Sequence, residues 1–388
     1  MKIKLYGKKQ VELKGFKFKD INFSSELYFN FKRFVIFLAT LSFFVFYLKN
    51  PLKSSHPHAA QRTQKRFYNL DFLRIIFMGQ IVYTHLSLPL KFDFSIVGYT
   101  EYFFILSGFF IFLTFKPEKS VFGFICEKIT RWWPLMIWGI LIRLCVTNDL
   151  NVEIFISELL FLPLTGVAAV GINQPDWFLA ALFWSSLFYL LLLKALDKNK
   201  FALALFFITT SSALVFAQGF YGIYNMQVIR GILGVGLGCC VAGLYLCIKD
   251  WLLQNKAKIN PVLPTLLECF MIANIFFCKN WLLAIFSNAF LIFLFSLQKG
   301  YVSNFFNTKF FAYPGKYVLA VFLTHGFIVN ELLPIFLKIY PQIAVYKITV
   351  MLVTYLAVVL FGIFSYNILG RKPDALKRLI FKGCATES

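Results

Sequence analysis

Long apolar runs separated by short polar segments recur along most of the chain. The sequence of 388 residues is 59% hydrophobic and 15% charged, whereas about a quarter of the residues in a soluble domain are charged. A transmembrane helix needs roughly 17 or more largely apolar residues. Ten runs reach or approach that length: 70–90, 97–115, 132–147, 177–193, 201–217, 227–248, 262–278, 281–297, 317–337 and 347–369. We therefore expect an all-α fold, a polytopic transmembrane helical bundle of about ten spans.

Two further apolar runs do not fit this pattern of spans. Pro163 and Gly166 interrupt residues 154–171, so we expect a non-spanning or re-entrant piece there. Residues 34–48 form a run of only 15 residues, below the usual spanning length. We interpret this run as an interfacial or re-entrant anchor. The alternative is an eleventh span, which would place the basic N-terminal arm outside.

The formal net charge of +21 is unevenly distributed. If the first span starts from the cytoplasm, the cytoplasmic loops hold most of the Lys and Arg. The opposite loops hold only Lys91, Lys279, Lys338 and Lys347. This asymmetry follows the positive-inside rule and predicts cytoplasmic N- and C-termini. We therefore interpret the charge as basic loops facing anionic membrane lipids, with no nucleic acid as a partner.

Cysteine and glycine are interpreted as packing residues. The eight cysteines form no CxxC pair, so we expect no disulfide framework and no metal site. The glycine-rich stretch 230–238 lies within an apolar span, which favours close helix packing over a phosphate-binding loop.

The first span carries the residues with the clearest chemistry. Arg74 and His85 are eleven residues apart in one apolar stretch, so they share a helix face about 16 Å apart along the axis. Asp71 shares that face within about 40°. Ionisable residues inside a membrane segment are functional candidates because charge in hydrocarbon is costly. We expect a slot that runs from a basic cytoplasmic mouth to His85.

Five short motifs in order resemble the acyltransferase-3 family of integral membrane acyltransferases over residues 66–375. They are Leu70-Asp71-Phe72-Leu73-Arg74 with His85, Glu101 to Phe109 with Ser107-Gly108-Phe109, Phe124 to Pro134 with Lys128 and Arg131, Gln174-Pro175-Asp176-Trp177, and Gly315 to His325. Any one motif alone is weak evidence for the family, but the order of the motifs and the membrane sides on which they lie agree with it.

The chain departs from the family pattern in several places. Many members continue the motif at Trp177 into a serine and a glutamate, and this chain has neither. Lys128 stands where arginine is commoner, and residues 370–373 lack the glutamate often seen before the proline. Because it shows no hydrolase-like domain, the chain resembles the stand-alone, polysaccharide O-acetyltransferase-like form.

The resemblance divides the chain into three parts. Residues 1–66 form a basic cytoplasmic arm, a short apolar anchor and a polar linker that starts at residue 50. Residues 67–375 form the membrane acyltransferase domain. Residues 376–388 form a cytoplasmic tail.

The resemblance also implies roles for particular residues. His85 is the general base that takes a proton from an acceptor hydroxyl. Arg74 binds phosphate of the acyl donor, oriented by Asp71. The other candidates are Lys128 and Arg131 for the donor phosphates, Ser107 and Gly108 for the pantetheine chain, and Trp177 and His325 for the acceptor. Structural alternatives stay open: a packing notch at Ser107 and Gly108, an interfacial anchor at Trp177 and a bundle brace at His325.

The expected activity is transfer of an acyl group, most simply acetyl, from cytoplasmic acetyl-CoA or another acyl-CoA to a hydroxyl. The acceptor is a cell-surface or lipid-linked glycan, and the location is the bacterial cytoplasmic (inner) membrane. Two other classes stay open. Buried Arg and His also occur in transporters, here of an anion or a lipid-linked sugar. A scaffold of a glycan-assembly complex is the third class.

Overall fold

The computed structural model describes residues 66–90, 98–118, 120–147, 151–168, 171–217, 227–255, 259–277 and 279–370. The apolar run 34–48, the linker up to residue 65 and the tail 376–388 lie outside the described residues. Within them the chain is helical and contains no β-strand; the one β contact is an isolated bridge between Pro163 and Ala168. The expected all-α class is confirmed for the part of the chain that the structure describes.

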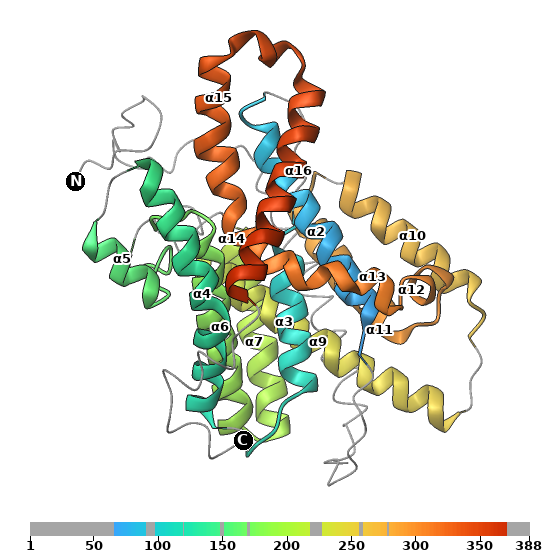
Figure 1. Cartoon of the computed structure of the whole chain (residues 1–388). Coiled ribbons are helices and arrows are strands. Elements are labelled where there is room, and N and C mark those ends of the chain that lie inside the picture. Colours follow the sequence, from blue (N-terminus) through green and yellow to red (C-terminus); the bar gives the residue numbers. More distant parts are fainter. Residues whose placement is uncertain are drawn as a thin grey trace, which may run out of the picture.

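The helices follow one another with short connections, as Figure 1 shows. They are α2 (Tyr68–Ser87), α3 (Glu101–Leu113), α4 (Val121–Thr147), α5 (Val152–Leu159), α6 (Asp176–Ala195), α7 (Lys198–Ala217), α9 (Gln227–Gln254), α10 (Val262–Phe277), α11 (Trp281–Leu297), α12 (Tyr301–Phe305), α13 (Lys309–Ala312), η1 (Tyr313–Tyr317), α14 (Val318–Gly326), η2 (Phe327–Leu332), α15 (Leu333–Ile339), η3 (Pro341–Val345), α16 (Lys347–Ser365) and η4 (Tyr366–Gly370).

Five helical segments are long and apolar enough to cross a membrane: Val121–Thr147, Asp176–Ala195, Gln227–Gln254, Lys309–Ile339 and Lys347–Leu369. The apolar helices α3, α10 and α11 are shorter. The chain is therefore an integral membrane protein with at least these candidate spans, and the figure of about ten spans stays a prediction. Helix α5 has eight residues, about 12 Å, too short to cross a bilayer.

One expectation about α4 is wrong. The apolar run 132–147 predicted a helix that begins after Lys128 and Arg131, whereas α4 begins at Val121. Both residues therefore lie inside the helix, beyond the first turn in which a helix end contributes partial positive charge. The polar residues of 121–131 hid this part of the helix, because hydropathy detects only its apolar continuation.

Helix α9 lies at the centre of one group of helices and packs against α3, α6 and α7. Glycines allow the closest approach: a Cβ on Gly108 would lie 1.9 Å from the carbonyl oxygen of Val235, and one on Gly238 would lie 2.0 Å from that of Ile105. The prediction that stretch 230–238 serves helix packing is confirmed. A second group joins α2, α14 and α16, and α10 and α11 lie to the other side of α2 (Figure 1).

Candidate active site

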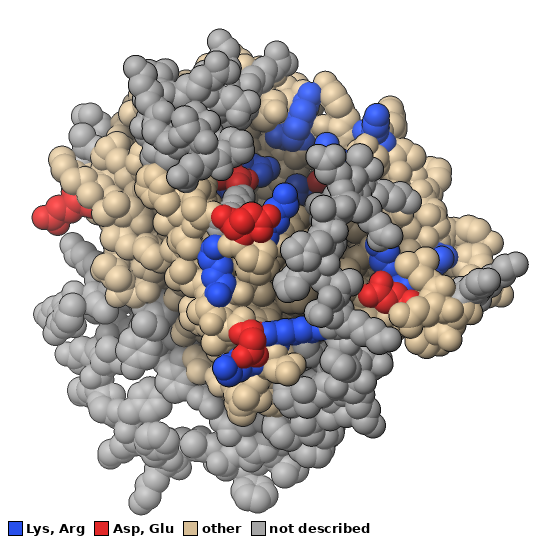
Figure 2. Space-filling model, turned by 90° about the horizontal axis from the view of Figure 1, so that it is seen from below, with Lys and Arg blue, Asp and Glu red and all other residues tan. Residues whose placement is uncertain are grey.

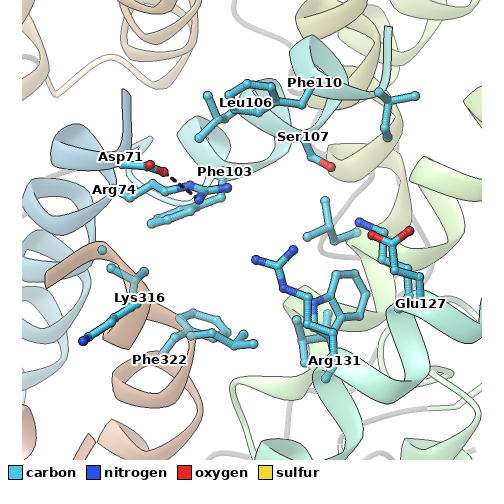
Figure 3. A pocket seen from close by; sticks show the side chains of 18 of the residues that line it. Asp71, Arg74, Phe103, Leu106, Ser107, Phe110, Glu127, Arg131, Lys316 and Phe322 are labelled. Carbon is cyan, nitrogen blue, oxygen red and sulfur yellow. Dashed lines mark hydrogen bonds and ion pairs between the residues drawn. The ribbon is translucent and has the colours of Figure 1, made fainter. Parts of the chain in front are cut away.

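A cavity of about 1020 Å³ lies between α2, α3, α4, α6 and α14. Figure 3 shows Arg74 and Arg131 reaching into it from different helices. Six cationic and two acidic residues line the cavity. The cations are Arg66, Arg74, Lys116, Lys128, Arg131 and Lys316, and the acids are Asp71 and Glu127. An excess of positive charge in a partly enclosed space attracts anions. The cavity is therefore suited to an anionic ligand such as a phosphate.

Asp71 ties two of these cations together. Its Oδ2 accepts hydrogen bonds from Nε of Arg66 at 2.9 Å, and its Oδ1 lies 3.0 Å from Nη1 of Arg74. The Asp71 side chain is 13% exposed and that of Arg74 is 32% exposed. Asp71 thus holds Arg74 at the cavity wall, as a residue that orients the guanidinium would do. Arg66 was not among the candidate site residues, and the structure adds it to the lining of the cavity.

Helix α4 supplies the facing cations. Arg131 points into the cavity from this helix (Figure 3). The Lys128 ammonium lies 5.1 Å from the ring centre of Phe124 and 5.0 Å from that of Trp132, within cation–π range. Figure 2 shows Lys and Arg side chains gathered with acidic ones on the lower face of the molecule. Lys116 and Lys316 also line the cavity. Neither was a candidate site residue, although Lys316 lies within the motif Gly315 to His325.

Ser107 and Gly108 are neighbours in the sequence but face different surroundings. Ser107 lines the cavity, and its Oγ lies 3.4 Å from Oγ of Ser186. Gly108 is not among the lining residues and packs against α9 at Val235. The packing alternative therefore describes Gly108, while Ser107 stays a candidate for ligand contact.

His85 and His325 face each other beyond the cavity. Their ring centres are 5.0 Å apart, and neither residue is among those that line the cavity. Nδ1 of His325 lies 2.5 Å from the carbonyl oxygen of Phe322, a hydrogen bond that exists when Nδ1 carries the proton. The structure thus brings together two histidines that the sequence separated by 240 residues.

His85 is not among the residues that line the cavity of Arg74, so the expected slot between the two residues stays a prediction. Phe178 and Phe322 both line the cavity. Their ring centres are 5.1 Å apart, and that of Phe322 is 5.8 Å from the His325 ring. Aromatic rings of α6 and α14 therefore pack against each other at the cavity lining, and the ring of Phe322 also contacts that of His325.

Trp177 belongs to a buried ion-pair cluster that the sequence did not reveal. Arg230 donates from Nε to Oε1 of Glu101 at 2.9 Å and from Nη2 to Oγ1 of Thr100 at 2.9 Å. Its guanidinium lies 5.0 Å from the ring centre of Trp177. Glu101 also accepts a hydrogen bond from Nε1 of Trp281 at 3.2 Å and is 1% exposed. The available signal was a charge inside an apolar span, at Glu101 and Arg230.

A second buried cluster, which contains the acids Glu158 and Asp176, lies near the start of α6. Oε1 of Glu158 accepts a hydrogen bond from the backbone N–H of Asn173 at 2.8 Å, and Nδ2 of Asn173 donates to Oδ1 of Asp176 at 2.9 Å. Burial raises the pKa of Glu158, on the short helix α5, to about 8. The same Asn173 amide also donates to the carbonyl oxygen of Leu323, which connects this group to the helix of His325.

Comparison with known proteins then identifies the kind of domain. The family model described as an acyltransferase domain, acyltransferase-3, matches residues 67–368. This match confirms the resemblance that the five motifs indicated. Neither the curated proteins nor the solved structures give a significant match to the chain.

Proposed function

The chain belongs to the acyltransferase-3 family and is a membrane acyltransferase, and on this premise we propose that it acetylates a hydroxyl group of a cell-surface or lipid-linked glycan. The donor is cytoplasmic acetyl-CoA, and neither a metal nor a nucleic acid takes part. The protein lies in the bacterial cytoplasmic membrane with about ten spans and both termini in the cytoplasm, as the distribution of Lys and Arg favours.

The observation that carries this proposal is the basic cavity within the acyltransferase domain. Arg74 and Arg131 line it together on different helices, and Asp71 fixes Arg74. Guanidinium groups bind phosphate well because their planar fork offers two aligned donors. Lys128 adds charge at the same wall. The phosphates of coenzyme A are the anions that an acyltransferase with this cavity would hold.

In the proposed reaction, the rest of the donor extends from the bound phosphates towards the acceptor. The pantetheine chain passes Ser107, which lines the cavity, and the acceptor approaches on the side of Trp177. His85 takes the proton of the acceptor hydroxyl while its oxygen attacks the thioester carbonyl carbon. A carbon–oxygen bond forms, the carbon–sulfur bond breaks, and the thiolate receives the proton to leave as the thiol. His325, next to His85, is placed to steady the imidazole.

The test combines two assays. Cells that produce His85→Ala or Arg74→Ala are expected to lose the acetyl mass increment on their glycans while membrane levels of the protein stay normal. Lys338→Ala, an exposed cation on α15 outside the cavity, is the matched control and keeps the increment. Purified protein is expected to consume acetyl-CoA; a protein that binds glycan but never consumes acetyl-CoA would be a transporter, and the proposal would fail.

A further inference from the structure

A single hydroxyl group interrupts an otherwise apolar part of the cavity lining. The lining residues within helices α3 and α6 are Phe103, Leu106, Ser107, Phe110 and Ile111, and Phe178, Leu179, Leu182 and Leu190. Among the described residues of these two helices, Ser107 is thus the only polar one in the lining. Helices α2 and α4 instead contribute charged side chains, among them Arg74 and Arg131. Ser107 points into the cavity from α3 (Figure 3).

Ser186 lies behind Ser107, on α6. It is four residues from both Leu182 and Leu190, which line the cavity, so all three residues share one helix face. Ser186 itself is 0% exposed and is not among the lining residues. Its Oγ lies 3.4 Å from that of Ser107. The connection of Ser186 with the cavity is therefore indirect, through Ser107.

The hydroxyl of Ser186 turns away from its own helix. The neighbouring Ser185, also 0% exposed, donates to the carbonyl oxygen of Ala181 at 2.6 Å, a common hydrogen bond of helical serines. Within the described part of the chain, Ser186 has Ser107 alone as a hydrogen-bond partner. A buried hydroxyl proton without an acceptor is costly, so the Ser186 hydroxyl donates to Oγ of Ser107. The proton of Ser107 is then free to point into the cavity.

We propose that Ser186 is a positioning residue that makes the Ser107 hydroxyl a hydrogen-bond donor to the pantetheine chain of the acyl donor. This inference rests on the proposed use of acyl-CoA. Pantetheine carries amide carbonyl groups, which accept hydrogen bonds, between methylene and methyl groups that suit the apolar side chains of α3 and α6. The phosphates of the donor are matched by the guanidinium groups of α2 and α4.

The experiment compares two ligands on the full-length protein in detergent micelles by calorimetry. Coenzyme A carries the pantetheine chain, and adenosine 3′-phosphate 5′-diphosphate keeps all the phosphates without it. Ser107→Ala is expected to weaken coenzyme A binding by about 3- to 10-fold, the range of one neutral hydrogen bond, and to leave nucleotide binding unchanged. Ser186→Ala weakens coenzyme A binding alone by about threefold. Ser185→Ala, equally buried but bonded within its own helix, keeps both affinities.

The double variant tests whether Ser186 acts through Ser107. The protein with both Ser107→Ala and Ser186→Ala is expected to bind coenzyme A as weakly as Ser107→Ala does, because Ser186 has no effect once the Ser107 hydroxyl is absent. Losses of affinity that add in the double variant would show that the two hydroxyls act independently, and would overturn the inference.

The outcomes separate this inference from the donor assignment. If coenzyme A does not bind the wild type, the donor assignment and this inference both fail. If coenzyme A binds the wild type, Ser107→Ala and Ser186→Ala with the same affinity, only the inference fails. If the two variants weaken both ligands equally, Ser107 contacts the nucleotide part of the donor, and again only the inference fails.

Discussion

The ion pair of Arg230 and Glu101 allows a prediction of how much unfolding free energy is lost when the Arg230 guanidinium is removed. Arg230→Met keeps an unbranched apolar stem of similar thickness and removes the guanidinium with its charge. Glu101 then stays 1% exposed and keeps as partners the hydroxyl of Thr100 at 3.0 Å and the indole of Trp281 at 3.2 Å. A buried charge that loses its counter-charge costs about 3–5 kcal/mol. We expect a loss of that size in the free energy of unfolding.

A double-mutant cycle isolates the pair itself. Glu101→Gln alone leaves Arg230, whose side chain is 17% exposed, without its carboxylate, whereas the double variant leaves two neutral side chains. The loss of unfolding free energy in the double variant is therefore expected to be about 2–3 kcal/mol smaller than the sum of the losses in the two single variants. The assay is reversible unfolding in mixed detergent and dodecyl sulfate micelles, followed by the fluorescence of Trp177 and Trp281, which both contact the pair.

The matched control is the ion pair of Arg143 and Glu331, whose Nη2 and Oε1 atoms are 3.0 Å apart. Its side chains are 20% and 19% exposed, so water partly compensates either residue alone. Breaking it is expected to cost nearer 1 kcal/mol, as for more exposed pairs. Additive single variants at Glu101 and Arg230, or a cost of Arg230→Met below that of Arg143→Met, would refute the reasoning.

Three further predictions concern packing, pH and the cavity. Gly108→Ala places a Cβ 1.9 Å from the Val235 carbonyl oxygen, so α3 and α9 must separate, and the same unfolding assay should show a loss of about 1–3 kcal/mol or more. Glu158, whose pKa burial raises to about 8, holds its proton more tightly in the folded protein, so its contribution to stability falls as pH rises from 4.5 towards 8. Glu158→Gln should weaken this pH dependence in thermal denaturation, and the exposed Glu153→Gln should not. Arg131→Met should weaken coenzyme A binding by about 10- to 100-fold in calorimetry, the value of a charged hydrogen bond, and an unchanged affinity would remove Arg131 from the site.

Much of the fold follows from the apolar pattern because a bilayer leaves few choices. Backbone polar groups in hydrocarbon must bond within the segment, so a long apolar run becomes a helix. The predicted run 281–297 coincides with α11 (Trp281–Leu297). The pattern was less informative at α4, whose first eleven residues are partly polar, and there the helix start was placed too late.

Part of the candidate site was also accessible from the sequence. A charge within an apolar run is costly, which singled out Arg74 and His85, and the spacing of Asp71 predicted its contact with Arg74. The same rule would have found Glu101 and Arg230, but it does not say that they pair. Their contact joins residues 129 positions apart, and it depends on how α3 and α9 pack.

The sequence by itself determined a helical membrane protein of the acyltransferase-3 family, because hydropathy, charge asymmetry and short motifs are local properties of the chain. Tertiary structure decided which cations share a cavity, that Arg230 pairs with Glu101, and that His85 lies next to His325. These features depend on the rotation and separation of packed helices, which are set by the summed contacts of many side chains and by small residues such as Gly108. No local pattern contains that information.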